Sequence, residues 1–172
     1  MFFLVWKVLY TFFLFNSNLV DRPLTAHVGN ASAFVLNFLG NTKDFRAETM
    51  TVKDYHEGNI TYLEASVIYH HDNIILNIAN VCNGLELIIL YIGFIVCMPS
   101  SFWRKVKYLV LGTLIIDFIN ILRCVGLIYL REYYELYFDF AHHYLFKAIV
   151  YSTTFLMWYV YSRKIQLKNE TI

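Results

Sequence analysis

Residues 108–130 read YLVLGTLIIDFINILRCVGLIYL, and this apolar stretch decides the fold class. A helix that crosses the hydrocarbon layer of a bilayer, roughly 30 Å thick, needs about 20 largely apolar residues. The stretch is long enough, but Asp117, Asn120 and Arg123 interrupt it. Because an ionisable side chain inside a membrane is costly, it indicates a functional site by default. Residues 108–130 therefore predict a transmembrane helix that carries part of a site.

The composition of the whole chain also indicates a membrane protein. Of its 172 residues, 58% are hydrophobic and 19% aromatic, and the mean hydropathy is +0.48, which is too apolar for an ordinary soluble domain. The formal net charge of +1 gives no reason to expect nucleic acid as a partner. Cys82, Cys97 and Cys124 lack the spacing of a zinc site or a disulfide framework. No metal and no other cofactor is therefore expected.

Three further stretches predict transmembrane helices, at residues 81–98, 144–161 and 1–20. The first 20 residues contain Lys7, whose ammonium can reach the headgroups from a helix end. A cleaved signal peptide is the alternative, but residues 15–22 contain no small-residue cleavage site, so an uncleaved anchor is favoured. The predicted fold is an all-α polytopic membrane protein with four transmembrane helices.

The distribution of lysine and arginine predicts the orientation, because both concentrate in cytoplasmic loops. They crowd the loop after residues 81–98 and follow residues 144–161, whereas residues 131–143 carry one arginine against three acidic side chains. Both termini are therefore predicted to be cytoplasmic. Residues 21–80 form an extracytoplasmic segment, and residues 81–172 form a three-helix core with a cytoplasmic tail. This describes a multi-pass protein of the plasma (inner) membrane.

The extracytoplasmic segment is predicted to contain two kinds of structure. Residues 24–39 place apolar side chains at helical spacing after Pro23, which predicts an amphipathic helix on the outer membrane surface. Residues 45–78 contain extended runs separated by turn-rich residues, which predict a small β-hairpin or meander. The helical face consists of Leu24, Val28, Ala31, Val35 and Phe38.

Cys82, Arg123 and His143 are predicted to lie at one depth, in the outer third of the membrane, with the adjacent His142 as the alternative histidine. Arg123 is seven residues before Leu130, so it lies about 10 Å below the outer end of its helix at about 1.5 Å per residue. A thiolate is a nucleophile, an imidazole can move its proton, and a guanidinium can stabilise the thiolate or an oxyanion. The three side chains together indicate cysteine-dependent acyl transfer.

Each side chain also has a structural interpretation. A membrane cysteine is more often a small apolar filler, and Arg123 could pair with Asp117 or Glu86 as a tether. Cys82 could instead form a disulfide with Cys124, since both lie toward the oxidising side. With an incidental thiol, the chain would be a non-catalytic membrane assembly factor or a carrier of a small anionic solute.

The same residues resemble the exosortase/archaeosortase family of membrane-embedded cysteine transpeptidases, and most closely its short, four-span members. The resemblance covers roughly residues 80–158. The motifs that carry it are Cys82-Asn83-Gly84, Asn120-Ile121-Leu122-Arg123 and Ala141-His142-His143-Tyr144-Leu145-Phe146.

The resemblance implies a role for each residue and a class of substrate. Cys82 would be the nucleophile, Arg123 the stabiliser of thiolate or oxyanion, and a histidine the acid and base. His143 is favoured over His142 because an aromatic side chain, Phe146, follows it by three residues. The family cleaves proteins near a C-terminal sorting signal, made of a short motif, a transmembrane helix and a basic tail. A thioester and transfer to a membrane-linked acceptor are then expected.

Four polar residues are predicted to support this set. Glu86 follows Cys82 by one helical turn, and Lys147 follows His143 in the same way, so a salt bridge between Glu86 and Lys147 is expected. Asp117 and Asn120 are also one turn apart, and a hydrogen bond between them is expected to hold Arg123 in position; a direct chemical role of Asp117 is the alternative.

Overall fold

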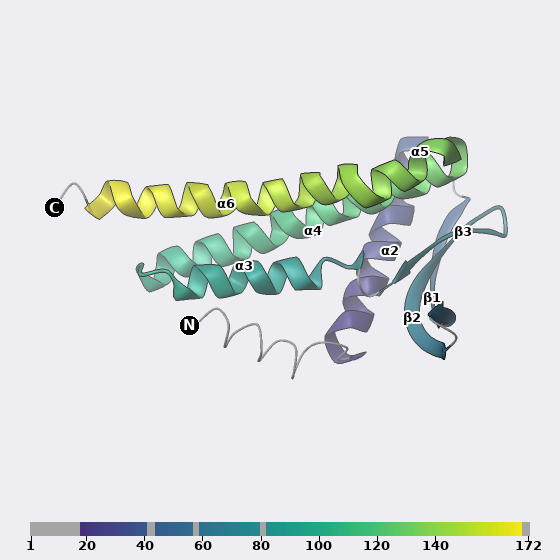
Figure 1. Cartoon of the computed structure of the whole chain (residues 1–172), viewed down its shortest axis with the longest axis horizontal. Coiled ribbons are helices and arrows are strands. Elements are labelled where there is room, and N and C mark those ends of the chain that lie inside the picture. Colours follow the sequence, from purple (N-terminus) through teal and green to yellow (C-terminus); the bar gives the residue numbers. More distant parts are fainter. Residues whose placement is uncertain (1–17, 41–43, 57–58, 80–81, 170–172) are drawn as a thin grey trace.

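Three helices form the long body of the protein. The structure is a computed structural model that describes residues 18–40, 44–56, 59–79 and 82–169. Helices α3 (Leu85–Cys97), α4 (Phe102–Tyr133) and α6 (Phe146–Asn169) run side by side along the longest axis (Figure 1). The short helix α5 (Glu135–Phe140) and a π-helical turn, η2 (Ala141–Leu145), connect α4 to α6.

Among the described residues, α4 is the one helix long and apolar enough to cross a membrane by length and composition. Helix α3 has 13 residues, and serine, threonine and tyrosine side chains lower the hydropathy of α6. The expected span at residues 1–20 lies almost entirely outside the described residues. Four transmembrane helices are therefore not confirmed.

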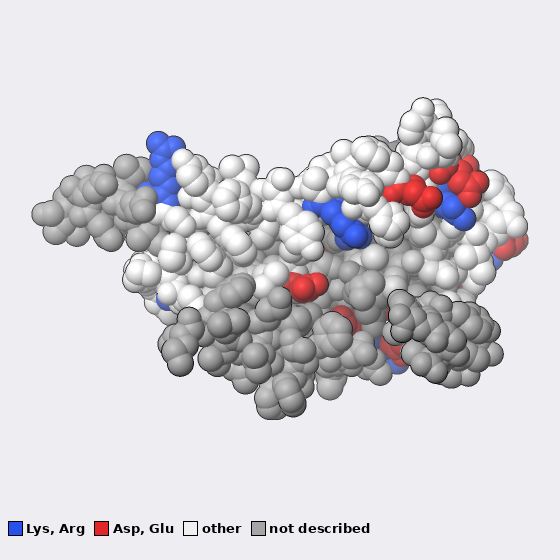
Figure 2. All heavy atoms as spheres, in the orientation of Figure 1, with Lys and Arg blue, Asp and Glu red and all other residues white. Residues whose placement is uncertain are grey.

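The surface of the long helices is nevertheless suited to lipid. Large apolar side chains face outward from α4 and α6, including Leu114, Phe118 and Phe155, which are 61%, 60% and 67% exposed. Figure 2 shows that the visible charged side chains lie mainly near the C-terminal end of α6 and in the half that carries the sheet. Outward-facing apolar area of this extent needs an apolar partner such as a bilayer.

The predicted β-structure is a three-stranded antiparallel meander. Strands β1 (Phe45–His56), β2 (Asn59–His70) and β3 (Asn73–Ala79) pair in the order β1-β2-β3. His70 pairs with Asn73 across a two-residue turn, and both turn residues, His71 and Asp72, have positive φ. Two central residues with positive φ are typical of a type I′ hairpin turn.

Helix α2 (Asn18–Gly40) lies between this sheet and α4 (Figure 1). It includes Pro23 and is longer than the predicted helix at 24–39. Its buried face consists largely of small residues. A Cβ atom added to Gly29 would lie 2.0 Å from the Ser66 Oγ atom of β2. Of the predicted apolar face, Val28 is fully buried but Phe38 is 77% exposed. The close packing of small residues, rather than the large apolar stripe, therefore sets the orientation of α2.

Two apolar clusters stabilise the fold. One joins α2, the sheet and the second half of α4, and Cys82 packs against it. The other joins α3, α4 and α6 around Tyr91, Ile116 and Tyr161. The Tyr91 hydroxyl donates a hydrogen bond to the Tyr108 carbonyl at 2.9 Å. Cys82 therefore lies at the junction between the helical body and the part formed by α2 and the sheet.

Candidate active site

A sharp turn at the start of α3 positions Cys82. Gly84 has a φ of 80°, in the left-handed region where a side chain other than glycine is strained. A Cβ atom at this position would lie 3.1 Å from the Asn120 Cγ atom. Gly84 therefore allows both the turn and the close approach of α4.

Asn83 fixes the same turn from inside the protein, where it is 1% exposed. Its side-chain nitrogen donates to the Asp21 carboxylate at 3.0 Å and to the Thr25 hydroxyl at 3.2 Å. Its side-chain oxygen accepts the Leu85 backbone N–H at 2.9 Å. The N–H group of Leu85 belongs to the first turn of α3, whose amides lack partners within the helix. Asn83 therefore supports the start of α3 and anchors it to α2.

Helix α4 contacts Cys82 at two points. Asn120 is fully buried and donates a hydrogen bond to the Cys82 backbone carbonyl at 3.1 Å. Arg123 approaches the Cys82 Sγ atom through Nη2 at 3.6 Å. Asn120 and Arg123 face Cys82 together because residues three apart are neighbours on a helix surface. The predicted proximity of Cys82 to Arg123 is therefore present in the structure.

Cys82 opens onto a cavity of about 340 Å³ that it shares with Cys124, His142 and Phe138. Part of β3 closes the cavity on another side. Both cysteines are free thiols, so the alternative of a disulfide between them is not observed. The cavity brings a thiol and an imidazole to the same space, next to the guanidinium of Arg123.

The structure brings His142 rather than His143 to this cavity. His142 lines the cavity together with Cys82, and His143 is not among its lining residues. His143 is exposed, and its Nδ1 atom lies 3.0 Å from the Asp139 carbonyl. Both histidines lie in the π-helical turn η2, a feature often found at functional sites.

Phe146 follows His142 by four residues and His143 by three, and both spacings make neighbours on a helix surface. A Cβ atom added to Gly126 of α4 would lie 2.5 Å from the Phe146 ring, so this aromatic side chain packs against α4. The spacing of Phe146 therefore does not distinguish the two histidines.

The surroundings of His142 favour its neutral form. Partial burial lowers the pKa of His142 below its ordinary value, and the positive charges of Arg123, His143 and Lys147 lower it further, against the opposite effect of Asp139. The His142 ring also stacks on Phe138, with 5.7 Å between ring centroids. A neutral imidazole can accept a proton, so the environment suits a general base.

Arg123 has no carboxylate partner among the described residues, so neither predicted tether, to Asp117 or to Glu86, is present. Its Nε–H is buried without a hydrogen-bond partner in that part of the chain. A second hollow of about 90 Å³ lies beside it, lined in part by Glu86 and Lys147. These two side chains form no ion pair with each other, so the predicted salt bridge is wrong. An uncompensated guanidinium stabilises negative charge that develops nearby.

Asp117 has a different partner from the one predicted. Its carboxylate lies 3.1 Å from the His27 Nε2 atom of α2, whereas Asn120 donates to Cys82. The predicted hydrogen bond between Asp117 and Asn120 is therefore wrong. Asp117 connects α4 to α2, and Asn120 alone of the two contacts the candidate nucleophile.

Sequence reasoning missed the bracing of Asn83 by Asp21 and Thr25. Asp21 and Asn83 are 62 residues apart in sequence, and no local pattern relates a residue before Pro23 to the start of α3. It also treated Cys124 only as a disulfide partner, although this buried thiol lines the cavity.

Comparison with known proteins gives one match. The family model described as transmembrane exosortase matches residues 1–160, which extends well beyond the motifs recognised in the sequence. No curated protein and no solved structure matches the chain.

Proposed function

Because the chain belongs to the transmembrane exosortase family, we propose that it is a membrane-embedded cysteine protease or transpeptidase with Cys82 as its nucleophile. Exosortases act in the membrane on proteins with C-terminal sorting signals. The observation that carries the assignment to this site is the 3.6 Å approach of Arg123 Nη2 to Cys82 Sγ, beside a cavity that His142 also lines.

The reaction begins with transfer of the Cys82 thiol proton to the neutral imidazole of His142. The thiolate attacks the carbonyl carbon of the scissile amide, a carbon–sulfur bond forms, and the carbonyl oxygen becomes an oxyanion. Arg123 stabilises this negative charge. The carbon–nitrogen bond then breaks, and His142 returns the proton to the leaving amine.

The product of this step is a thioester between Cys82 and the exported protein. A second nucleophile attacks the thioester carbonyl and releases the thiol. Water gives hydrolysis, whereas a membrane-linked acceptor gives transfer. In both cases His142 accepts the proton of the attacking group.

The site faces the extracytoplasmic side in this proposal, and both termini are cytoplasmic. Two observations support it. Arg104, Lys105 and Lys107 lie at the end of α4 distant from the sheet, and such clusters favour the cytoplasm. The sheet and α2 carry polar segments that suit an aqueous compartment.

The direct test is a processing assay in cells that express the full chain with a tagged protein ending in a short motif, a transmembrane helix and a basic tail. Cys82→Ala and Arg123→Ala are each expected to abolish the size change of the tagged protein while the chain still inserts. Cys97→Ala, at the other end of α3, is the matched control and should process normally.

The competing function is a non-catalytic assembly factor or a carrier of a small anion, for which Arg123 and Lys147 would supply positive charge. Cys82→Ser distinguishes the two functions, because an incidental thiol tolerates this change whereas a thiol nucleophile does not. Normal processing by Cys82→Ala would overturn the proposed function.

A further inference from the structure

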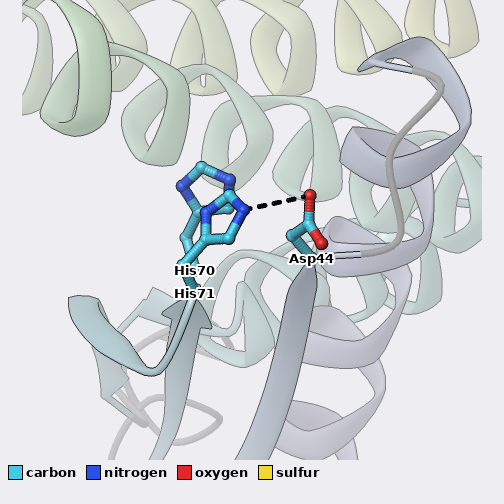
Figure 3. Close-up of side chains that lie close together, drawn as sticks. All are labelled: Asp44, His70 and His71. Atoms are coloured by element: carbon cyan, nitrogen blue, oxygen red, sulfur yellow. Dashed lines mark ion pairs between the residues drawn. The ribbon is translucent and has the colours of Figure 1, made fainter.

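A second cluster of reactive side chains lies at the end of the sheet, away from Cys82. It consists of Asp44 just before β1, His70 at the end of β2, and His71 in the following turn. One possible ligand atom from each residue lies within 4.8 Å of the others. In Figure 3 the two imidazoles lie next to each other, and His71 points toward the Asp44 carboxylate.

His70 is held as histidine ligands of metals are commonly held. Its Nδ1 atom lies 2.8 Å from the Glu132 carboxylate of α4, and its ring stacks on Phe45 with centroids 4.2 Å apart. When Nδ1–H donates to a carboxylate, the lone pair of Nε2 remains for a ligand. A hydrogen bond of this kind fixes the tautomer and orientation of a metal-binding histidine.

The distance between His71 and Asp44 also fits a metal better than a direct bond. His71 Nε2 and Asp44 Oδ2 are 3.4 Å apart, longer than the approximately 2.7–2.9 Å of a charge-assisted hydrogen bond. Two ligands of a tetrahedral Zn²⁺ ion, each about 2.0–2.1 Å from it, lie about 3.4 Å apart. His71 and Asp44 are 65% and 42% exposed, so small rotations can complete the geometry.

We propose that Asp44, His70 and His71 bind a divalent transition metal ion, with Zn²⁺ as the ion that the donors suit best. Two imidazoles and one carboxylate form a nitrogen-rich set of the kind Zn²⁺ uses with water as a fourth ligand. Glu132 orients His70 without contacting the ion. Arg46, a cation at the same end of the sheet, is paired with Asp72.

The ion would fasten the end of the sheet to α4. Glu132 lies nine residues after Arg123 on the same helix, so the ion, through His70 and Glu132, links the sheet to the helix that holds Cys82. This site does not depend on the proposed activity, because its ligands lie outside the cavity that contains the thiol.

The test is metal binding by the full-length chain in detergent, with any histidine tag removed and bound metal stripped by a chelator. Titration with Zn²⁺ alone is followed by calorimetry, and titration with Co²⁺ by visible absorption, which reports coordination. Wild type is expected to bind one ion per chain and to gain thermal stability from it. His71→Ala, a change at an exposed position, should weaken Zn²⁺ binding at least tenfold.

Two further variants separate a metal site from ordinary ion pairs. Glu132→Gln should weaken binding roughly 10–100-fold, as expected for loss of an orienting partner. Glu48→Gln removes an exposed carboxylate of β1 that is not among the proposed ligands, and it should bind Zn²⁺ as wild type does. Absence of saturable Zn²⁺ binding, or equal affinity in wild type and His71→Ala, would overturn the proposal.

Discussion

Asn120 and Arg123 divide the positioning of Cys82 between its backbone and its sulfur. The Asn120 hydrogen bond to the Cys82 carbonyl holds the main chain, and so fixes where the Cys82 side chain begins relative to Arg123. A typical hydrogen bond of this type contributes about 1 kcal/mol net to stability. A reaction slows when the attacking group is held less precisely against its target atom.

We expect Asn120→Ala to lower the rate of substrate processing about tenfold or more, with normal membrane insertion. A double-mutant cycle with Gly84→Ala provides the control. Asn120 and Gly84 act on the same turn, so the loss of processing rate in the double variant should be smaller than the sum of the two single losses, in free-energy terms. The rate of processing in the single and double variants measures this. Full additivity would show that the contact between Asn120 and the turn is incidental.

His142 and His143 can be separated by single substitutions. His142→Ala is expected to reduce processing by about 10²-fold or more, the contribution typical of general acid and base catalysis. His143→Ala should retain most of the rate, because His143 is exposed and lies outside the cavity. Measuring both variants at equal expression tests the assignment, and the reverse pattern would restore the prediction made from the sequence.

Lys147 gives a test through pH. Its charge is one of the causes, after burial and the charges of Arg123 and His143, that lower the pKa of His142. A base with a lowered pKa stays neutral to a lower pH. The processing rate of wild type should therefore persist below pH 6.5, which is the ordinary pKa of histidine. Lys147→Ala should raise that pKa and move the acid limb of the pH–rate profile upward.

The matched control for this profile is Arg163→Ala, which removes a cation near the far end of α6. Its profile should coincide with that of wild type. An unchanged acid limb in Lys147→Ala would mean that another group controls the loss of rate at low pH.

At the scale of elements, regular patterns were predictable and long-range partners were not. The span at 108–130 lies within α4, and the extended runs at 45–78 form the meander, because both follow from the spacing of apolar side chains. Cys82 and Arg123 could be placed at a similar depth because the distance of each from the predicted outer end of its helix follows from counting residues. The choice between His142 and His143 depends on the angular position of adjacent residues in a π-helical turn, and the sequence does not specify that turn.

The predicted contacts of Glu86, Lys147 and Asp117 are wrong for a related reason. Helical spacing gives the face of a side chain, but the rotation of one helix against another decides which charges meet. Asp117 instead contacts His27 of helix α2, which the sequence did not place next to α4. The predicted face of α2 relied on large apolar residues, whereas the structure buries small ones against the sheet.

The packing of α2 can be tested at Gly29. A Cβ atom there would approach Ser66 Oγ to 2.0 Å, so Gly29→Val should force α2 away from the sheet. Overpacking of this kind usually destabilises by about 1–3 kcal/mol. The measurement is thermal or chemical unfolding in detergent. Asn30→Ala, at the exposed neighbouring position, is the control, and equal stability of the two variants would contradict the packing described.

At the scale of the whole molecule, the proposed orientation places Cys82 and Cys97 toward opposite sides of the membrane. Cys82 precedes α3 and Cys97 is its last residue, and Cys97 is exposed near the basic segment after it. In intact cells or right-side-out vesicles, a membrane-impermeant maleimide should label Cys82 and leave Cys97 unmodified until the membrane is opened. Cys82→Ala and Cys97→Ala identify each adduct by mass spectrometry. Preferential labelling of Cys97 in sealed vesicles would reverse the topology.

The length of α3 has a consequence for the surrounding lipid. Its 13 residues extend about 20 Å at about 1.5 Å per residue, whereas the hydrocarbon layer is roughly 30 Å thick. A helix that begins at one headgroup layer therefore ends about 10 Å before the other, unless the bilayer thins around it. In the proposed orientation this shortfall lies at the cytoplasmic end of α3, so thinning of the bilayer there would leave the thiol near the outer headgroup layer, level with the end of a substrate's membrane anchor.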